Sequence, residues 1–280
     1  IIRDMVGRDM AHRYPERTPN PGEMLFQVEN WSCFHPEQAG RQMIKGVSLN
    51  VRKGEIVGIA GLMGAGRTEF AMSIFGRSYG KGHQGTVKMH GKPVDVSTVT
   101  KAIDAGISYV TEDRKALGLI LEEPILKNIS LANLFGIAKN SILDKRRETQ
   151  VAEGYRKQLA IRTPGVQQKV VNLSGGNQQK VVLSKWLFTD PALLILDEPT
   201  RGIDVGAKFE IYTIMKDLAE QGRGVLMISS EMPELLGMCD RIYVMNEGRI
   251  VGELARDEAS QEKIMALIVK DNSKTAGKVA

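Results

Sequence analysis

The feature that most constrains the fold is a run of four aliphatic residues, Leu193 to Leu196, followed at once by Asp197 and Glu198. An unbroken apolar run of this length is typical of a strand covered on both faces, as the strands of a parallel sheet are. The carboxyl ends of such strands form the edge at which α/β sheets bind their ligands. The run therefore predicts a parallel sheet with two carboxylates at its ligand-binding edge.

Strand and helix patterns alternate around this run. Residues 207–220 carry apolar side chains at helical spacing, and residues 125–187 are mainly helical in pattern. Strands are predicted at 25–30, 47–51, 55–60, 106–111, 193–196, 225–229, 241–245 and 249–253, with a hairpin at 86–94. Alternating βα units indicate an α/β fold with a mostly parallel sheet, on which the early antiparallel strands and the mid-chain helices are insertions.

A glycine-rich segment follows the strand predicted at 55–60 and opens a helix. It approximates the phosphate-binding pattern G-x-x-x-x-G-K-[ST], in which backbone N–H groups surround phosphate oxygens. Arg67 stands where the pattern has lysine, and arginine is a larger, planar cation that prefers bidentate contacts. We expect the loop to bind a nucleotide without supporting fast hydrolysis; the alternative is a glycine-rich turn that binds none. The predicted phosphate contacts are Gly61, Gly64, Ala65, Gly66, Arg67 and Thr68.

The two carboxylates after the apolar run suit phosphoryl transfer. Asp197 and the hydroxyl of Thr68 are predicted to hold Mg²⁺, and Glu198 to polarise the attacking water. The alternative is a strand-end turn that happens to be acidic.

A second anion-binding segment is predicted just before the run. Ser174 and two glycines open a helix, and the N–H groups of a helix N-terminus attract anions. Ser174 is also expected to act as the N-cap, which is compatible with anion binding. The residues assigned to this segment are Leu173, Ser174, Gly175, Gly176 and Asn177.

From about residue 23 to residue 270 the chain resembles an ABC-type ATPase domain. More narrowly, it resembles the C-terminal ATPase half of the duplicated ATP-binding subunits of bacterial monosaccharide importers, the ribose, galactose and xylose or multiple-sugar group. The segments that carry this resemblance are 61–68, 112–115, 173–179, 199–206 and 229–234.

The resemblance implies a P-loop NTPase core with an antiparallel β subdomain and an inserted helical subdomain at about 118–187. It implies ATP and Mg²⁺ as cofactors. In ABC dimers each ATP lies between the P-loop of one half and the signature segment of the other. Here residues 173–177 are the signature segment, and Asp204 belongs to the D-loop that accompanies it.

Three positions depart from the general ABC pattern. Glu112 stands in place of the Q-loop glutamine, Ser230 in place of the switch histidine, and Arg67 in place of the lysine. Together with Glu198 from the acidic pair, the resemblance assigns Ser230 and Glu112 to the catalytic positions of this half. The resemblance implies an unequal pair, in which this half completes a competent site on its partner and forms a degenerate site itself. The isolated chain is expected to hydrolyse ATP weakly or not at all.

The implied partners are an N-terminal ATPase half of the same chain, transmembrane permease subunits and, indirectly, a periplasmic sugar-binding protein. The implied location is peripheral, at the cytoplasmic face of the bacterial inner membrane. The net charge of +5 is spread along the chain, and we expect no nucleic-acid partner. The alternatives are a catalytically inactive regulatory nucleotide-binding module and a soluble ABC ATPase that acts on nucleic acid.

The first 22 residues are predicted to be the tail and linker of a preceding domain, with 23–280 forming the ATPase domain. A short apolar helix is expected up to about Met10, followed by a segment with three prolines between residues 14 and 22. Two well-separated cysteines favour a reducing compartment. Trp31 and Phe34 are the candidates to stack on adenine, with core packing as the alternative.

Overall fold

The structure is a computed structural model that describes residues 13–276, with side chains described to Lys270. The helix predicted up to about Met10 lies outside the described residues. The described chain divides into two compact units. The sheet unit comprises residues 17–109, 192–198 and 215–276, and the helical unit comprises residues 13–16, 110–191 and 199–214.

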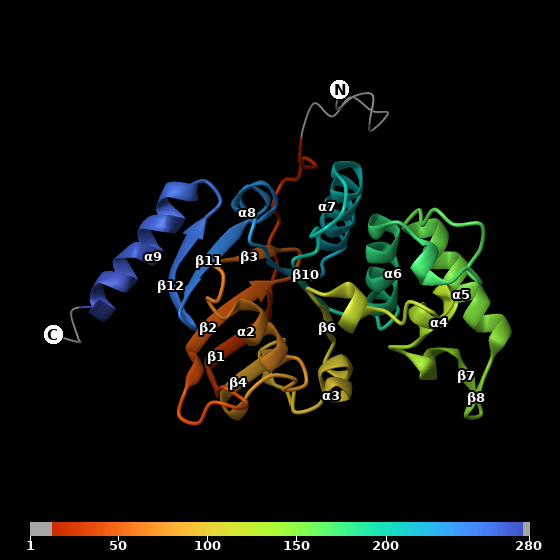
Figure 1. The fold of residues 1–280 in the computed structure, drawn as a ribbon, viewed down its shortest axis with the longest axis horizontal. Helices are drawn as coiled ribbons and strands as arrows, with labels where there is room; N and C mark the ends of the chain where they lie inside the picture. The colour runs from red at the N-terminus through yellow and green to blue at the C-terminus, as the bar shows by residue number, and fades with distance from the viewer. Residues whose placement is uncertain (1–12, 277–280) are drawn as a thin grey trace. The chain divides into compact units, whose positions relative to one another are not determined.

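A six-stranded sheet with the order β12-β11-β3-β10-β9-β6 forms the core of the sheet unit (Figure 1). Strand β10 pairs in parallel with both β3 and β9, and β11 pairs in parallel with β3. Strand β12 is joined antiparallel, through its hairpin with β11. Every residue of β3, β9 and β10 is buried, which for β9 confirms what the apolar run predicted. The bounds are β3 Ile56–Ala60, β6 Ile107–Val110, β9 Leu193–Asp197, β10 Gly224–Ile228, β11 Arg241–Asn246 and β12 Arg249–Ala255.

A separate antiparallel sheet has the order β2-β1-β4-β5. Its strands are β1 Met24–Phe34, β2 Gln42–Arg52, β4 Lys81–Met89 and β5 Lys92–Pro93. The hairpin predicted at 86–94 is confirmed as the β4–β5 pair. Strands β1 and β2 are longer than the sequence indicated, because irregularities in their pairing let both strands bend and continue. Together with the parallel sheet, this confirms the predicted α/β class with an antiparallel β subdomain.

Four helices complete the sheet unit: α2 Arg67–Ile74, α3 Val99–Asp104, α8 Met232–Met238 and α9 Gln261–Ala276. Pro233 lies in the first turn of α8, where its missing N–H costs no helical hydrogen bond. Helix α7, Val205–Glu220, begins in the helical unit and ends in the sheet unit. No helix within residues 13–276 combines the length and the hydrophobicity needed to cross a bilayer.

The helical unit is built around α6, Gly175–Leu187, whose residues from Gln178 onward are all buried. Helix α4 packs against both α5 and α6. The remaining elements are α4 Ile125–Ser130, α5 Lys145–Gln158, the short helices η1 Arg114–Gly118, η2 Leu134–Ile137 and η3 Val170–Asn172, and the hairpin of β7 Ala138–Lys139 with β8 Ile142–Leu143. The unit also takes in residues 199–214, directly after the acidic pair.

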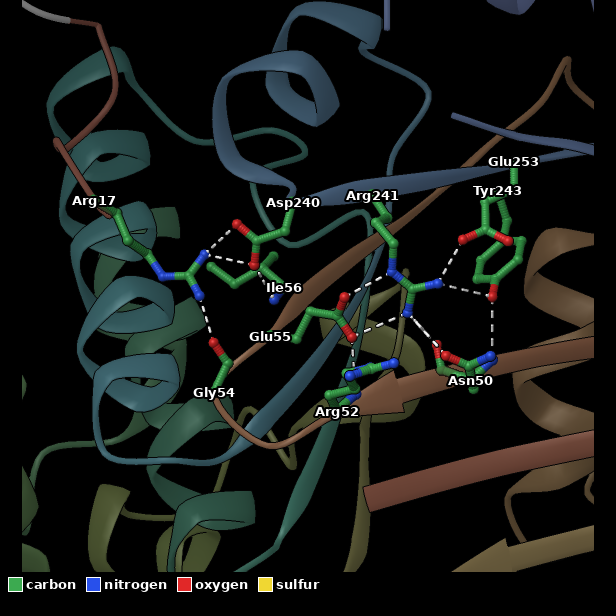
Figure 2. A network of polar contacts seen from close by, with 10 residues as sticks. All are labelled: Arg17, Asn50, Arg52, Gly54, Glu55, Ile56, Asp240, Arg241, Tyr243 and Glu253. Carbon is green, nitrogen blue, oxygen red and sulfur yellow. Dashed lines mark hydrogen bonds and ion pairs between the residues drawn. The ribbon is translucent and has the colours of Figure 1, made fainter. Parts of the chain in front are cut away.

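The proline-containing segment is tied to the sheet unit by a buried ion pair (Figure 2). Arg17 Nη1 donates to both carboxylate oxygens of Asp240, at 2.6 and 2.7 Å, and Arg17 Nη2 donates to the carbonyl of Gly54. Asp240 also accepts the N–H of Ile56 at 2.9 Å, at the start of β3. The Arg17 and Asp240 side chains are only 5% and 7% exposed. The segment is therefore fastened at the strand whose other end leads into the glycine-rich loop.

A second ion pair lies beside the first in Figure 2. Arg241 makes a bidentate contact with Glu55, at 2.6 and 3.0 Å, and Glu55 also accepts the N–H of Arg52 at 2.8 Å. Two opposite-charge pairs thus hold the amino ends of β3 and β11 together. Bidentate arginine contacts of this kind are geometrically specific, which suits them to setting the position of a strand.

We predict that Arg17→Ala lowers the free energy of unfolding by about 3–5 kcal/mol, because it leaves the Asp240 carboxylate buried without its cation. Urea unfolding measures the change. The matched control is Lys53→Ala, which removes a cation whose partner Glu23 is 86% exposed; exposed pairs contribute about 1 kcal/mol or less. Equal effects of the two substitutions would contradict the prediction.

Candidate functional site

The glycine-rich loop between β3 and α2 has a backbone that requires its glycines. Gly64 and Gly66 have φ of +80° and +97°, in the left-handed region that residues with a Cβ rarely adopt. A Cβ on Gly61 would lie 2.6 Å from the carbonyl of Met245 on β11. Ala65 is buried, whereas Met63 at the tip is almost fully exposed. Such turns ahead of a helix form concave surfaces lined by backbone N–H groups, a geometry that suits anions.

Asp197 and Thr68, predicted to hold Mg²⁺, lie together in the sheet unit. Asp197 is fully buried at the end of β9 and accepts hydrogen bonds from the Thr68 and Tyr109 hydroxyls. Its Oδ1 atom is buried and makes no hydrogen bond within the described residues. Burial raises the pKa of Asp197 to about 6, although the two hydroxyls act in the opposite direction. A buried carboxylate oxygen without a partner, beside a hydroxyl, fits a hard cation such as Mg²⁺.

Tyr109 is a member of this site that sequence reasoning missed. Its hydroxyl donates to Asp197 at 2.9 Å from the neighbouring strand β6, and its ring packs on Phe75 with centroids 5.7 Å apart. Burial and the nearby carboxylate raise the pKa of Tyr109 well above its usual range, so the hydroxyl stays a donor. The available signal was its position near the carboxyl end of a predicted strand, where ligand sites gather.

Two of the three altered positions converge on Glu198. Ser230 Oγ donates to Glu198 Oε2 at 3.1 Å, and Arg67 Nη2 lies 3.8 Å from Glu198 Oε1. Arg67 Nη1 also donates to the carbonyl of Ser229 at 2.6 Å. Arg67 and Glu198 are 11% and 10% exposed. Sequence reasoning assigned Arg67 to phosphate, but its guanidinium is engaged with the predicted catalytic carboxylate.

The backbone and the charge of Glu198 are both perturbed. Its φ of +47° is unusual for a residue with a Cβ, and such strained positions cluster at functional sites. Burial raises the pKa of Glu198, while the Arg67 charge and the Ser230 hydrogen bond act to lower it. The carboxylate is thus held by two partners in a largely buried place.

In the helical unit, Ser174 occupies the N-cap position of α6 but does not cap it. The predicted capping hydrogen bond is wrong: the Ser174 side chain accepts no backbone N–H of the first turn, and its Oγ instead accepts a hydrogen bond from the side-chain amide of Asn177 at 2.9 Å. The first turn of α6 therefore has no side-chain cap, which keeps the anion-binding geometry open. Gly176 packs against α7, where a Cβ would lie 2.5 Å from that of Ala207.

The other assigned residues of the helical unit also have structural partners. Glu112 forms an ion pair with Arg201, and Asp204 Oδ1 accepts the N–H of Ala207 at 2.9 Å at the start of α7. The loop, Asp197, Glu198 and Ser230 belong to the sheet unit, whereas Glu112, residues 173–177 and Asp204 belong to the helical unit.

Of the two aromatic candidates for adenine, Trp31 is excluded by burial. It is 2% exposed, and its Nε1 donates to Ser73 Oγ at 2.9 Å, so the alternative of core packing holds. Phe34, at the end of β1, is 36% exposed.

The sequence profile described as ABC transporter matches residues 44–201, and the chain belongs to that family. Among individual proteins, it is 62% identical over 270 residues to the L-arabinose transport ATP-binding protein AraG of Geobacillus stearothermophilus, covering 96% of this chain and 53% of that protein. It is 52% identical to the xylose import ATP-binding protein XylG of Thermoanaerobacter pseudethanolicus, covering 95% and 52%. It is 48% identical to the ribose import ATP-binding protein RbsA of Clostridium perfringens strain 13, covering 98% and 53%.

The chain therefore spans about half the length of the curated relatives it matches. Among solved structures, the ATP-binding cassette MJ1267 in its ADP conformation aligns with a TM-score of 0.72 and 22% identity, covering 89% of this chain and 99% of that one. The cassette MJ0796 with ADP and Pi aligns with a TM-score of 0.69 and 21% identity, covering 83% and 99%. These two likenesses confirm the ABC ATPase fold.

We predict that Asp197→Asn stabilises the chain at neutral pH. Because the folded pKa of about 6 exceeds the ordinary value of 3.8, the folded state holds a proton that the unfolded state releases between these values. Wild-type stability should therefore fall as pH rises from about 4 to 6 and stay low above that window. Asp197→Asn should raise the free energy of unfolding by up to about 3 kcal/mol at neutral pH and by almost nothing below about pH 4. Urea unfolding across this pH range, with the exposed Asp217→Asn as control, measures it; a gain independent of pH would contradict the prediction.

We also predict that Arg67→Ala raises the pKa of Glu198 further, because it removes the cation that favours the ionised carboxylate. Arg67→Lys should raise it less. The measurement is a carbon-13 NMR titration of labelled glutamate carboxyls, with the Glu198 signal assigned by Glu198→Gln. Substitution of the exposed Arg77 by alanine should leave the signal unchanged. A Glu198 titration unmoved by Arg67→Ala would exclude the ion pair.

Proposed function

We propose that this chain is the C-terminal ATPase half of the ATP-binding subunit of a bacterial monosaccharide importer. The observation that carries the proposal is its 62% identity, over 96% of the chain, to an L-arabinose transport ATP-binding protein. The names of the xylose and ribose relatives point to the same class of cargo. In this proposal residues 1–22 are the tail and linker of a preceding half, and 23–280 form the ATPase domain, with its helical subdomain at about 118–187.

The proposed assembly contains this half, an N-terminal ATPase half of the same chain and transmembrane permease subunits. A periplasmic sugar-binding protein would deliver the sugar to the permease. The ATPase subunit would lie peripherally at the cytoplasmic face of the inner membrane. The support for a second half is that the chain spans about half the length of its relatives.

The nucleotide in this proposal is ATP with Mg²⁺, which when bound neutralises charge on the phosphates. The left-handed glycines Gly64 and Gly66 suit the loop to phosphate oxygens. Thr68 and the unpartnered Oδ1 of Asp197 would hold the metal ion. Burial raises the pKa of Asp197 only to about 6, so at neutral pH this carboxyl is mainly ionised and would be available to the cation.

The site formed by this half is proposed to be degenerate. Glu198 could activate water only as a free base, but here it lies beside Arg67 and accepts a hydrogen bond from Ser230. Arg67, in turn, is directed to Glu198 and the carbonyl of Ser229. We therefore expect the chain alone to turn over slowly. Its signature segment and Asp204 would complete the competent site formed by the P-loop of the other half.

A second candidate is a catalytically inactive regulatory module that binds nucleotide without transport. The pairing of Arg67 with Glu198 favours it, because both residues would be withdrawn from catalysis. The two candidates differ in what the signature segment does: it serves hydrolysis in the importer and has no catalytic partner in the regulatory module.

We predict that, in the full-length subunit reconstituted with its permease, Ser174→Arg abolishes sugar-coupled hydrolysis, whereas Glu198→Gln costs much less. Ser174 is exposed at the first turn of α6, so arginine there should spare the fold while occupying the place of a phosphate. Gly176→Asp would also damage the signature segment, but its side chain would clash with Ala207, so it would not separate a loss of function from a loss of fold. The measurements are uptake of labelled arabinose, xylose and ribose into proteoliposomes and phosphate release.

The matched control is Gln150→Arg, which adds the same cation at an exposed position of α5. Equal damage from Ser174→Arg and Glu198→Gln would show two equivalent sites and overturn the asymmetric proposal. ATP binding without sugar-dependent hydrolysis in the wild-type assembly would favour the regulatory module.

A further inference from the structure

The segment Glu112 to Lys115 is one of those that carry the resemblance to sugar importers. Its Arg114 has no role in the nucleotide site described above. Asp113 fixes the local backbone, because its Oδ1 accepts the N–H groups of Lys115 and Ala116 at 2.9 and 3.0 Å. These bonds form the N-terminal cap of η1, which begins at Arg114. Arg114 therefore projects from a short, well-anchored turn of the helical unit.

The guanidinium of Arg114 holds the turn that precedes Asp204. Nη1 donates to the carbonyl of Arg201 at 2.7 Å, and Nη2 donates to the carbonyl of Gly202 at 3.2 Å. Its Nε is buried and makes no hydrogen bond in the part of the chain that the structure describes. Two successive carbonyls thus set the place of the guanidinium, and only a fork-shaped donor can serve both at once.

The same guanidinium lies against the start of the signature helix. A Cβ built on Gly175, the first residue of α6, would lie 2.9 Å from Arg114 Nη2 and 3.1 Å from the carbonyl of Gly202. The missing side chain at Gly175 therefore lets the arginine and the turn approach the helix N-terminus. The ion pair of Glu112 with Arg201 is a second link between the segment at 112–114 and the turn at 201–202, and it is more exposed.

The electrostatics of this arrangement favour an anion. A helix N-terminus carries positive potential, so a cation placed against it is unfavourable unless a negative group binds there. Burial lowers the pKa of Arg114, but a guanidinium remains charged at neutral pH. The uncapped first turn of α6 and the Arg114 charge would both be stabilised by a phosphate at the signature segment.

We infer that Arg114 is a positioning residue for hydrolysis: it holds the D-loop turn at Arg201 and Gly202 and the start of the signature helix as one body. This inference rests on the proposed function, since the phosphate concerned is that of ATP held by the other ATPase half. The segment 112–114 occupies the Q-loop position, so a displacement of this segment moves the signature and D-loop elements together.

The first test uses the full-length subunit with its permease and compares Arg114→Ala, Arg114→Lys and Lys115→Ala. Lys115 is the matched control, an exposed cation next in the chain. Arg114→Ala should lower kcat roughly tenfold or more, since two charge-assisted hydrogen bonds are lost. KM for ATP should stay within about twofold, because the other P-loop supplies most of the nucleotide contacts. Arg114→Lys should recover less than half of the lost rate, and Lys115→Ala should match wild type.

The second test is hydrogen exchange on the same full-length subunits without nucleotide. The amides to follow are Gln178, which donates to Ser174 at 2.9 Å, and Ala207 and Lys208, which donate to Asp204 at 2.9 Å. In Arg114→Ala, exchange should accelerate about threefold or more in both helix starts, and Lys115→Ala should leave it unchanged. This readout does not depend on transport or on hydrolysis.

Unchanged exchange in Arg114→Ala, faster exchange in only one of the two segments, or a kcat within about twofold of wild type would each overturn the inference. If Arg114→Ala does not fold, Arg114→Lys takes its place in the test. A wild-type kcat in Arg114→Lys, whose ammonium cannot serve both carbonyls as a guanidinium does, would also overturn the inference. A wild-type assembly that hydrolyses no ATP would refute the proposed function, while the exchange data would still judge the physical link.

Discussion

The parallel pairing of β3, β10 and β9 is the constraint on which the nucleotide site depends. Because the three strands run in one direction, their carboxyl ends lie at one edge of the sheet. The glycine-rich loop follows β3, Ser229 and Ser230 follow β10, and Asp197 ends β9. Groups separated by more than a hundred positions in the sequence meet there, without any local interaction to bring them together. The buried ion pairs at the opposite ends of β3 and β11 hold these strands in place.

The chemistry of this edge is dominated by the cost of burying carboxylates. Asp197 lowers that cost by accepting hydrogen bonds from the Thr68 and Tyr109 hydroxyls and, below about pH 6, by holding a proton. Glu198 lowers it with the Arg67 cation and the Ser230 hydroxyl. Arg67 and Ser230 therefore contact the same carboxylate, one at each oxygen.

In the helical unit, the first turn of α6 has no side-chain cap on its backbone N–H groups. The Asn177 side chain donates a hydrogen bond to Ser174 Oγ. Gly175 allows Arg114, and Gly176 allows α7, to approach the first turn of α6 closely. Gly175 and Gly176 thus have packing roles, whatever ligand they bind. Both positions are predicted from the sequence to contact an anion, and the contacts around them also require the absence of a side chain.

The amino-acid sequence alone was enough to predict the individual elements: the buried strands, the loop after β3, the hairpin at 86–94 and the helix that starts near Gly175. Each follows from side-chain periodicity or from turn residues within a few positions, which are local properties. The tertiary structure alone decided which groups meet. Tyr109 reaches Asp197 across the sheet, Arg67 turns to Glu198, and Trp31 is buried on Ser73. Such contacts join distant segments, and because a side chain's partner depends on packing in three dimensions, no local pattern in the sequence specifies it.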